Sequence, residues 1–150
     1  MSYDIQESMG YLSRRASKAI GKRLLENFSR VGYKLNAYQW MVLTYLNAND
    51  YVPQNELAEF TGKDKAGITR IIDTLEAQNY LRRRQDTRDR RSNQIFLTDE
   101  GRAFVQKLTT IADNTLSELY EGISPRQLET TRKVMNKILE NARQLNTAQD

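Results

Sequence analysis

Apolar residues recur at helical spacing through most of this 150-residue chain, and this pattern constrains the fold more than any other feature of the sequence. Between residues 7 and 30 they stand three or four positions apart, which places them on one stripe of an amphipathic helix. Such a stripe needs a second surface to cover it, so the pattern predicts a mostly helical protein with a packed core. The same spacing is found over 37–46, 65–78 and 99–120 and from residue 125 onward.

The composition excludes several kinds of chemistry, because the chain contains neither cysteine nor histidine. Disulfides, zinc sites with Cys or His ligands, and Cys–His or Ser–His catalysis are therefore ruled out. The net charge of +4 modestly favours an acidic partner such as nucleic acid. The sequence has no run of about eighteen apolar residues and no secretory signal, so we expect a cytoplasmic protein without a membrane partner.

A helix-turn-helix is predicted over residues 54–78. A short helix over 54–60 leads into a tight turn, where Gly62 gives the backbone freedom to reverse and Asp64 can cap the next helix. In that second helix, residues 65–78, a leucine and three isoleucines form the inner face and the polar residues between them face outward. The outward residues are Lys65, Thr69, Arg70 and Asp73.

Two short strands, residues 81–84 and 93–97, follow the helix-turn-helix and are separated by a charged loop. Strand alternation sends Arg83 to the face opposite its neighbours, so we expect it to brace the hairpin against the helices. Asp86 and Asp89 are expected to pair with neighbouring arginines and so hold the hairpin in shape before a partner binds. The loop then presents its remaining arginines, Arg88, Arg90 and Arg91.

A helix-turn-helix followed by a hairpin with arginines at its tip is the arrangement of a winged helix. The second helix fits the major groove of B-DNA, and the basic loop can reach the adjacent minor groove. The predicted fold class is therefore mostly α with a small β-hairpin wing (α+β), and the predicted partner is double-stranded DNA. Asp73 is expected to orient Arg70 or Arg91, because a carboxylate facing DNA is otherwise unfavourable. The predicted DNA-contacting residues are Lys63, Lys65, Thr69, Arg70, Arg88, Arg90 and Arg91.

The charged loop and the residues after it resemble the signature of a known family. The motif reads Asp86-x-Arg88-Asp89-x-Arg91-Ser92, then Ile95-x-Leu97-Thr98 and Gly101, and it is similar to that of the MarR family of bacterial and archaeal transcriptional regulators. Residues 56–81 also resemble the family's DNA-reading segment. Asn79 stands where the family usually has glycine, but asparagine tolerates the left-handed conformation. Gly67 stands where a small polar residue is common, which leaves one side chain fewer to contact DNA.

The resemblance implies a homodimer in which residues 1–150 form one protomer. A winged helix-turn-helix lobe at 36–97 would bind one half of a pseudo-palindromic operator, and dimerisation helices at 1–31 and 98–150 would join the two copies. The apolar stripes of the terminal helices favour this independently, because each needs a partner surface. The resemblance also implies a repressor displaced by a small aromatic or anionic effector, with no other cofactor.

Other functions remain open at this point. The chain fits a DNA-binding protein without a ligand, acting as a constitutive or architectural factor, and winged helices also serve as RNA-binding or protein-interaction modules. An enzyme is disfavoured, because the sequence contains no nucleophile–base set, phosphate loop or metal cluster. Several aromatic residues in the first third of the chain suggest a ligand pocket, although aromatics at helical spacing more often belong to the core. They are Tyr11, Tyr33, Tyr38, Trp40, Tyr45 and Tyr51.

Overall fold

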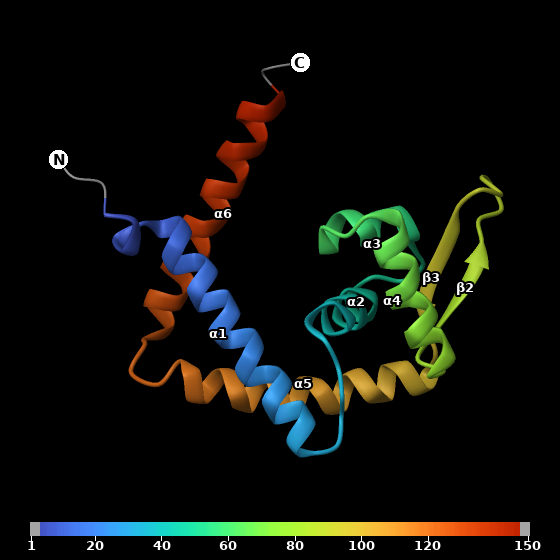
Figure 1. Ribbon diagram of the computed structural model, residues 1–150, viewed down its shortest axis with the longest axis horizontal. Coiled ribbons are helices and arrows are strands. Elements are labelled where there is room, and N and C mark those ends of the chain that lie inside the picture. The colour runs from blue at the N-terminus through green and yellow to red at the C-terminus, as the bar shows by residue number, and fades with distance from the viewer. Residues whose placement is uncertain (1–3, 148–150) are drawn as a thin grey trace. The chain divides into compact units, whose positions relative to one another are not determined.

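The computed structural model describes residues 4–147, which leaves residues 1–3 and 148–150 of the predicted dimerisation segments outside the described part. The predicted fold class is confirmed: the chain is mainly helical and carries one small antiparallel sheet (Figure 1). It forms two compact units, one reaching to Leu116 and the other beginning at Ser117. The elements are η1 (Ile5–Glu7), α1 (Met9–Arg30), α2 (Ala37–Ala48), β1 (Val52–Pro53), α3 (Gln54–Thr61), α4 (Lys65–Ala77), β2 (Leu81–Gln85), β3 (Asn93–Leu97), α5 (Asp99–Leu119) and α6 (Pro125–Thr147).

Capping residues set the starts of α2 and α4, and the cap on α4 is the Asp64 that the sequence predicts. At the start of α2, the Asn36 side chain accepts from the Gln39 N–H at 2.8 Å, and the Gln39 side chain accepts from the Asn36 N–H at 2.9 Å. The Asp64 carboxylate caps α4 by accepting from the Gly67 N–H at 2.7 Å. Asn79 follows α4 with a φ of +66°, the left-handed conformation expected there.

The core of the first unit is a single cluster to which every α-helix and strand up to α5 contributes. Phe28 of α1, Leu43 of α2, Ile72 of α4 and Leu108 of α5 are each fully buried in it. The inner face of α4 therefore packs against the rest of the unit, as its spacing predicts. Because this face is fixed, the direction of the outer face of α4 is fixed as well.

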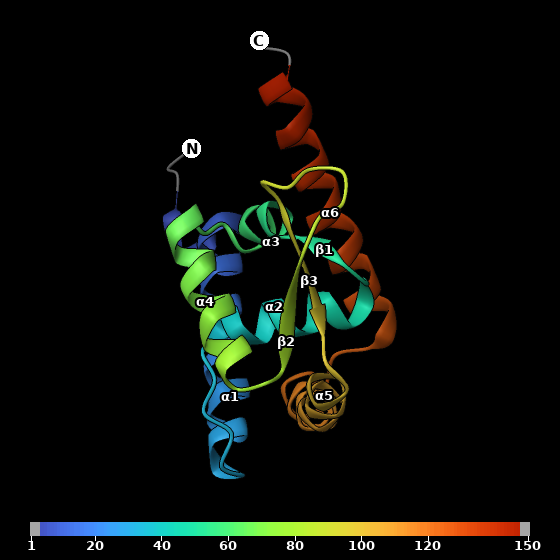
Figure 2. The same ribbon diagram turned by 90° about the vertical axis from the view of Figure 1, so that its right-hand side faces the viewer.

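The sheet has the strand order β1-β3-β2, and its first strand was not predicted. The sequence of residues 47–53 predicts a turn, whereas Val52 and Pro53 pair with Ile95 and Gln94 of β3. A strand of two residues is too short to show an alternation of apolar and polar positions, so no pattern could reveal it. In both views the loop between β2 and β3 lies at the end of the hairpin far from α5 (Figures 1 and 2).

Apolar side chains on the terminal helices stay uncovered within the described chain. In the first unit, Met9 and Leu12 of α1 are 49% and 44% exposed. In the second unit, none of the residues Pro125–Thr147 of α6 is buried, and Val134 and Ile138 are 45% and 47% exposed. Both helices have the apolar stripe that the sequence predicts, but this part of the stripe has no cover in the described chain.

Candidate nucleic-acid interface

The outer face of α4 presents the polar residues predicted to contact DNA. Lys65 and Arg70 are exposed, and Thr69 is half-buried between them. The side chains of Lys65 and Arg70 make no hydrogen bond or ion pair with any residue between 4 and 147. Their charges are therefore available to an external partner.

The loop of the hairpin is held in shape by its two aspartates, although their partners differ from those predicted. Asp86 Oδ1 accepts from the backbone N–H of Arg88 at 2.7 Å, and Asp89 Oδ1 accepts from the backbone N–H of Arg91 at 2.9 Å. The prediction of ion pairs with guanidinium groups is thus wrong, because short Asp side chains reach the amide two residues ahead more readily. The consequence favours binding: Arg88, Arg90 and Arg91 keep exposed guanidinium groups on an ordered loop.

Arg83 joins β2 to α4 through two carboxylates. Its guanidinium donates to Asp73 and, at 2.8 Å, to Glu76. The expectation that Asp73 orients Arg70 or Arg91 is corrected, since its partner is Arg83. The pairing neutralises two acidic groups of α4 close to the predicted DNA-reading residues and fixes the base of the hairpin to that helix.

Replacing Arg83 with methionine is expected to lower the free energy of unfolding by about 1 kcal/mol, because the stem still packs while both ion pairs are lost from a partly exposed site. DNA affinity is expected to fall too, since Asp73 and Glu76 would then face DNA unneutralised. Urea unfolding and duplex titration measure the two effects. Arg83→Lys is the matched control: it keeps the charge but not the forked geometry, so an intermediate stability is expected. Wild-type stability for Arg83→Met would contradict the bracing role.

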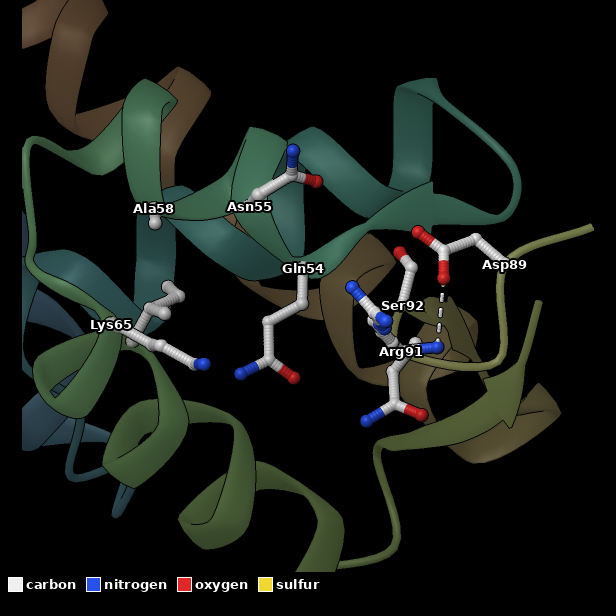
Figure 3. Close-up of a pocket in the computed structure, with 9 residues that line it drawn as sticks. Gln54, Asn55, Ala58, Lys65, Asp89, Arg91 and Ser92 are labelled. Atoms are coloured by element: carbon white, nitrogen blue, oxygen red, sulfur yellow. Dashed lines mark hydrogen bonds between the residues drawn. The ribbon is translucent and has the colours of Figure 1, made fainter.

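A pocket of about 460 Å³ separates α4 from the hairpin loop. Figure 3 shows Gln54 between Lys65 on one side and Arg91, Ser92 and Asp89 on the other. Gln54 also donates from Nε2 to Thr69 Oγ1 at 2.9 Å. Sequence analysis missed Gln54 and its neighbour Asn55, since periodicity shows that they begin a helix but not that the start of this helix faces the wing.

A second hollow, of about 260 Å³, lies between α2 and the neighbouring face of α4. Lys63 and Arg70 both line it, and Lys63 Nζ stands 3.9 Å from the centre of the Tyr38 ring. This cation–π contact holds Lys63 in a defined place beside α4. The cations predicted from the sequence thus lie on α4, just before it and on the hairpin loop. Both hollows lie beside α4.

The aromatic residues of the first third of the chain have separate contacts and do not meet in one ligand pocket. Trp40 packs against Phe28, Tyr33 against Phe104, and Tyr45 against Phe60. The Tyr45 hydroxyl donates to Glu56 at 2.6 Å, and this hydrogen bond raises the pKa of Tyr45. The ring centres of Tyr51 and Phe96 are 4.9 Å apart, and the guanidinium carbon of Arg84 lies 4.3 Å from the centre of the Tyr51 ring.

Residues 4–147 contain neither a metal-ligating cluster nor a membrane-spanning helix. No group of three or more acidic side chains in this part of the chain could hold a metal ion. No helix within the same residues is long and apolar enough to cross a membrane.

Comparison with known sequences identifies relatives among transcriptional regulators. The sequence profile of the MarR family matches residues 32–92. The chain is 32% identical over 122 residues to the HTH-type transcriptional regulator PrsX of Escherichia coli, an alignment that covers 79% of this chain and 74% of PrsX. It is 27% identical to the transcriptional repressor MprA of Escherichia coli, over 78% of this chain and 69% of MprA.

Comparison with solved structures shows the same fold in transcriptional regulators. A MarR-family regulator from Rhodococcus sp. RHA1 superimposes with a TM-score of 0.82 at 23% identity, covering 91% of this chain and 96% of that one. BpsR of Bordetella bronchiseptica, whose DNA binding is regulated by 6-hydroxynicotinic acid, gives 0.78 at 25% identity, covering 92% and 97%. The chain therefore belongs to the MarR family of transcriptional regulators.

Proposed function

We propose that the protein is a sequence-specific repressor that binds double-stranded DNA as a homodimer and is released by a small aromatic or anionic ligand. One observation carries the proposal. Exposed cations line both sides of the pocket between α4 and the hairpin loop, while the acidic residues beside them are engaged within the protein. A helix and a basic loop placed in this way can enter a major groove and the adjacent minor groove together.

Each predicted residue then has a role at the interface. Arg70 and Thr69 on the outer face of α4 read base edges in the major groove. Arg83, Asp86 and Asp89 hold the hairpin for the arginines at its tip. Phosphates and the minor groove are bound by Lys63, Lys65, Arg88, Arg90 and Arg91.

The homodimer is supported by the uncovered apolar side chains of α1 and α6. Residues 36–97 form the DNA-binding lobe in this proposal, and residues 1–31 and 98–150 form the dimer interface. Two-fold symmetry then requires two half-sites about one helical turn apart, roughly 34 Å. Analytical ultracentrifugation of Ile138→Lys tests this directly: a charge on the stripe is expected to yield monomers.

Release by a small ligand is supported by BpsR, whose DNA binding responds to an aromatic acid. Repression is supported by MprA, which is a transcriptional repressor. A ligand-independent DNA-binding protein is the alternative. Thermal unfolding in the presence of aromatic acids separates the two, because a ligand that binds the folded state raises the melting temperature.

The test of the DNA-binding function is selection of bound sequences from random duplexes, followed by salt titration of the enriched sequence and a scrambled one. Tight binding of the enriched duplex, with a steep salt dependence and a large preference over the scrambled duplex, is the expected result. Equal, weak binding to both would favour an architectural protein. Preference for single strands would point to an RNA-binding module.

Lys65 and Arg70 give a matched pair of variants, since each loses one positive charge from the same helix. Lys65→Ala is expected to weaken binding to every duplex alike and to lower the salt slope by about 2, because the homodimer loses one phosphate contact in each protomer. Arg70→Ala is expected to weaken binding to the selected sequence by about 1 to 3 kcal/mol and to random duplex less. An unchanged preference in Arg70→Ala would remove Arg70 from base reading.

A further inference from the structure

We propose that Thr69 recognises a thymine through its methyl group, and that Gln54 is the positioning residue that orients the Thr69 side chain for this contact. This inference rests on the proposed function, because it requires α4 to lie in the major groove. It goes further by naming the chemistry that Thr69 can recognise and by assigning a role to a residue of another helix.

The hydroxyl of Thr69 is already engaged within the protein. Its hydrogen is donated to the Lys65 carbonyl oxygen at 2.8 Å, and its oxygen accepts from Gln54 Nε2 at 2.9 Å. A threonine hydroxyl has one hydrogen and two lone pairs, so Thr69 keeps one lone pair but has no hydrogen left to donate to a phosphate or to the O4 atom of a thymine. Both bonds run to groups of the protein, one to the preceding turn of α4 and one to α3.

The choice of glutamine at position 54 supports this reading. Gln54 Oε1 is buried and has no hydrogen-bond partner among the described residues. Leaving a buried carbonyl unpaired is costly, and a methionine would fill similar space without that cost. Oε1 and the phosphate oxygens are both hydrogen-bond acceptors, so Oε1 cannot form a hydrogen bond with a phosphate of the DNA backbone. The bond from Nε2 to Thr69 is the contribution that only the amide makes.

The methyl group is what Thr69 then offers to DNA. Thr69 lies on the outward side of α4 between Lys65 and Arg70, both exposed. Thymine is the base that presents a methyl group in the major groove, and removing two methyl groups from water together is favourable. A thymine is therefore expected opposite Thr69, chosen by apolar contact.

Deoxyuridine substitution tests the proposal, because deoxyuridine keeps every hydrogen-bonding atom of thymidine and lacks only the methyl group. In the sequence selected by the wild-type protein, each thymine is replaced in turn and the affinity is measured. One position in each half-site is expected to lose roughly three- to fivefold in affinity. Thr69→Val keeps a methyl group in a restricted rotamer, so replacing this thymine by deoxyuridine is expected to weaken its binding as it weakens that of the wild type. Thr69→Ser keeps only the hydroxyl, so its affinity is expected to be the same for thymine and deoxyuridine.

The positioning role is tested with Gln54→Met, which retains the volume and removes the amide. Its preference for thymine over deoxyuridine is expected to fall towards that of Thr69→Ser. Asn55→Ala is the control: Asn55 lines the same pocket, but no hydrogen bond joins it to Thr69 in the described chain, so the preference should persist.

The outcomes separate this inference from the function on which it rests. Retention of the thymine preference by Thr69→Ser, or its loss in Thr69→Val that folds normally, would overturn the methyl contact. Absence of any deoxyuridine-sensitive position in a tightly bound sequence would overturn it too. Failure to enrich any duplex sequence would instead refute the proposed function.

Discussion

Alanine at Gly101 is expected to destabilise the protein by about 3 kcal/mol or more. A Cβ atom at this position would lie 1.9 Å from the Tyr80 carbonyl oxygen and 2.9 Å from its carbon. These are backbone atoms, so no side-chain rotation can relieve the overlap and the two segments must separate. Overpacking of this kind commonly costs 1–3 kcal/mol, and the forced movement of backbone places Gly101 at the upper end or beyond.

The separation would also break the hydrogen bonds that join the hairpin and α5 to the end of α4. The Thr98 N–H donates to the Tyr80 carbonyl at 3.1 Å, and its hydroxyl donates to the Asn79 carbonyl at 2.6 Å. Thr98 Oγ1 also accepts from the Gly101 N–H at 2.9 Å and so caps α5. These hydrogen bonds thus hold the start of α5 against the backbone of Tyr80. The two segments are then too close to leave room for a Cβ atom at residue 101.

Urea unfolding followed by far-ultraviolet circular dichroism measures the effect of Gly101→Ala. Gly21→Ala is the matched control, because Gly21 lies in the middle of α1 and a Cβ there meets nothing within 4 Å. Alanine is a better helix former than glycine, so this control is expected to gain about 0.5 to 1 kcal/mol. A Gly101→Ala protein within about 0.5 kcal/mol of wild type would show that the junction tolerates a side chain.

The sequence predicts well those features that depend on residues close together in the chain. The capping box of Asn36 and Gln39 and the cap of Asp64 on α4 act over three residues, so their chemistry is visible in the sequence. The inner face of α4 follows equally well, because helix geometry alone converts spacing into direction. Asn79 in the left-handed conformation is a further local property, set by one residue type.

The features that the sequence does not predict depend on which elements lie next to each other in the fold. Arg83 and Asp73 are ten residues apart in different elements, and several exposed carboxylates could equally have been the partner of Arg83. The bond between Gln54 and Thr69 likewise requires knowing that α3 begins beside the outer face of α4. The strand Val52–Pro53 exists only because β3 supplies a partner for it. Tertiary placement decides all three.

Removing the arginines of the hairpin loop together is expected to have the largest effect on DNA binding. In a protein with Arg88, Arg90 and Arg91 all replaced by alanine, affinity for the selected duplex should fall roughly a thousandfold, since each substitution costs about 1 to 3 kcal/mol. Because the homodimer carries these arginines twice, the salt slope should decrease by about 5 if all of them contact phosphates. Titration of a labelled duplex over a range of salt measures both quantities.

The same variant is expected to stay folded, which is what makes the measurement decisive. Asp86 and Asp89 hold the loop through the backbone N–H groups of residues 88 and 91, and alanine keeps those groups. A control that loses three cations from α6, Arg126, Arg132 and Lys133, has the same net charge and should bind DNA nearly as well as wild type once analytical ultracentrifugation shows that it is still a dimer. If the loop variant bound like this control, the hairpin would not touch DNA and α4 alone would form the interface. If it lost affinity only because it unfolded, the arginines would serve the fold and not the duplex.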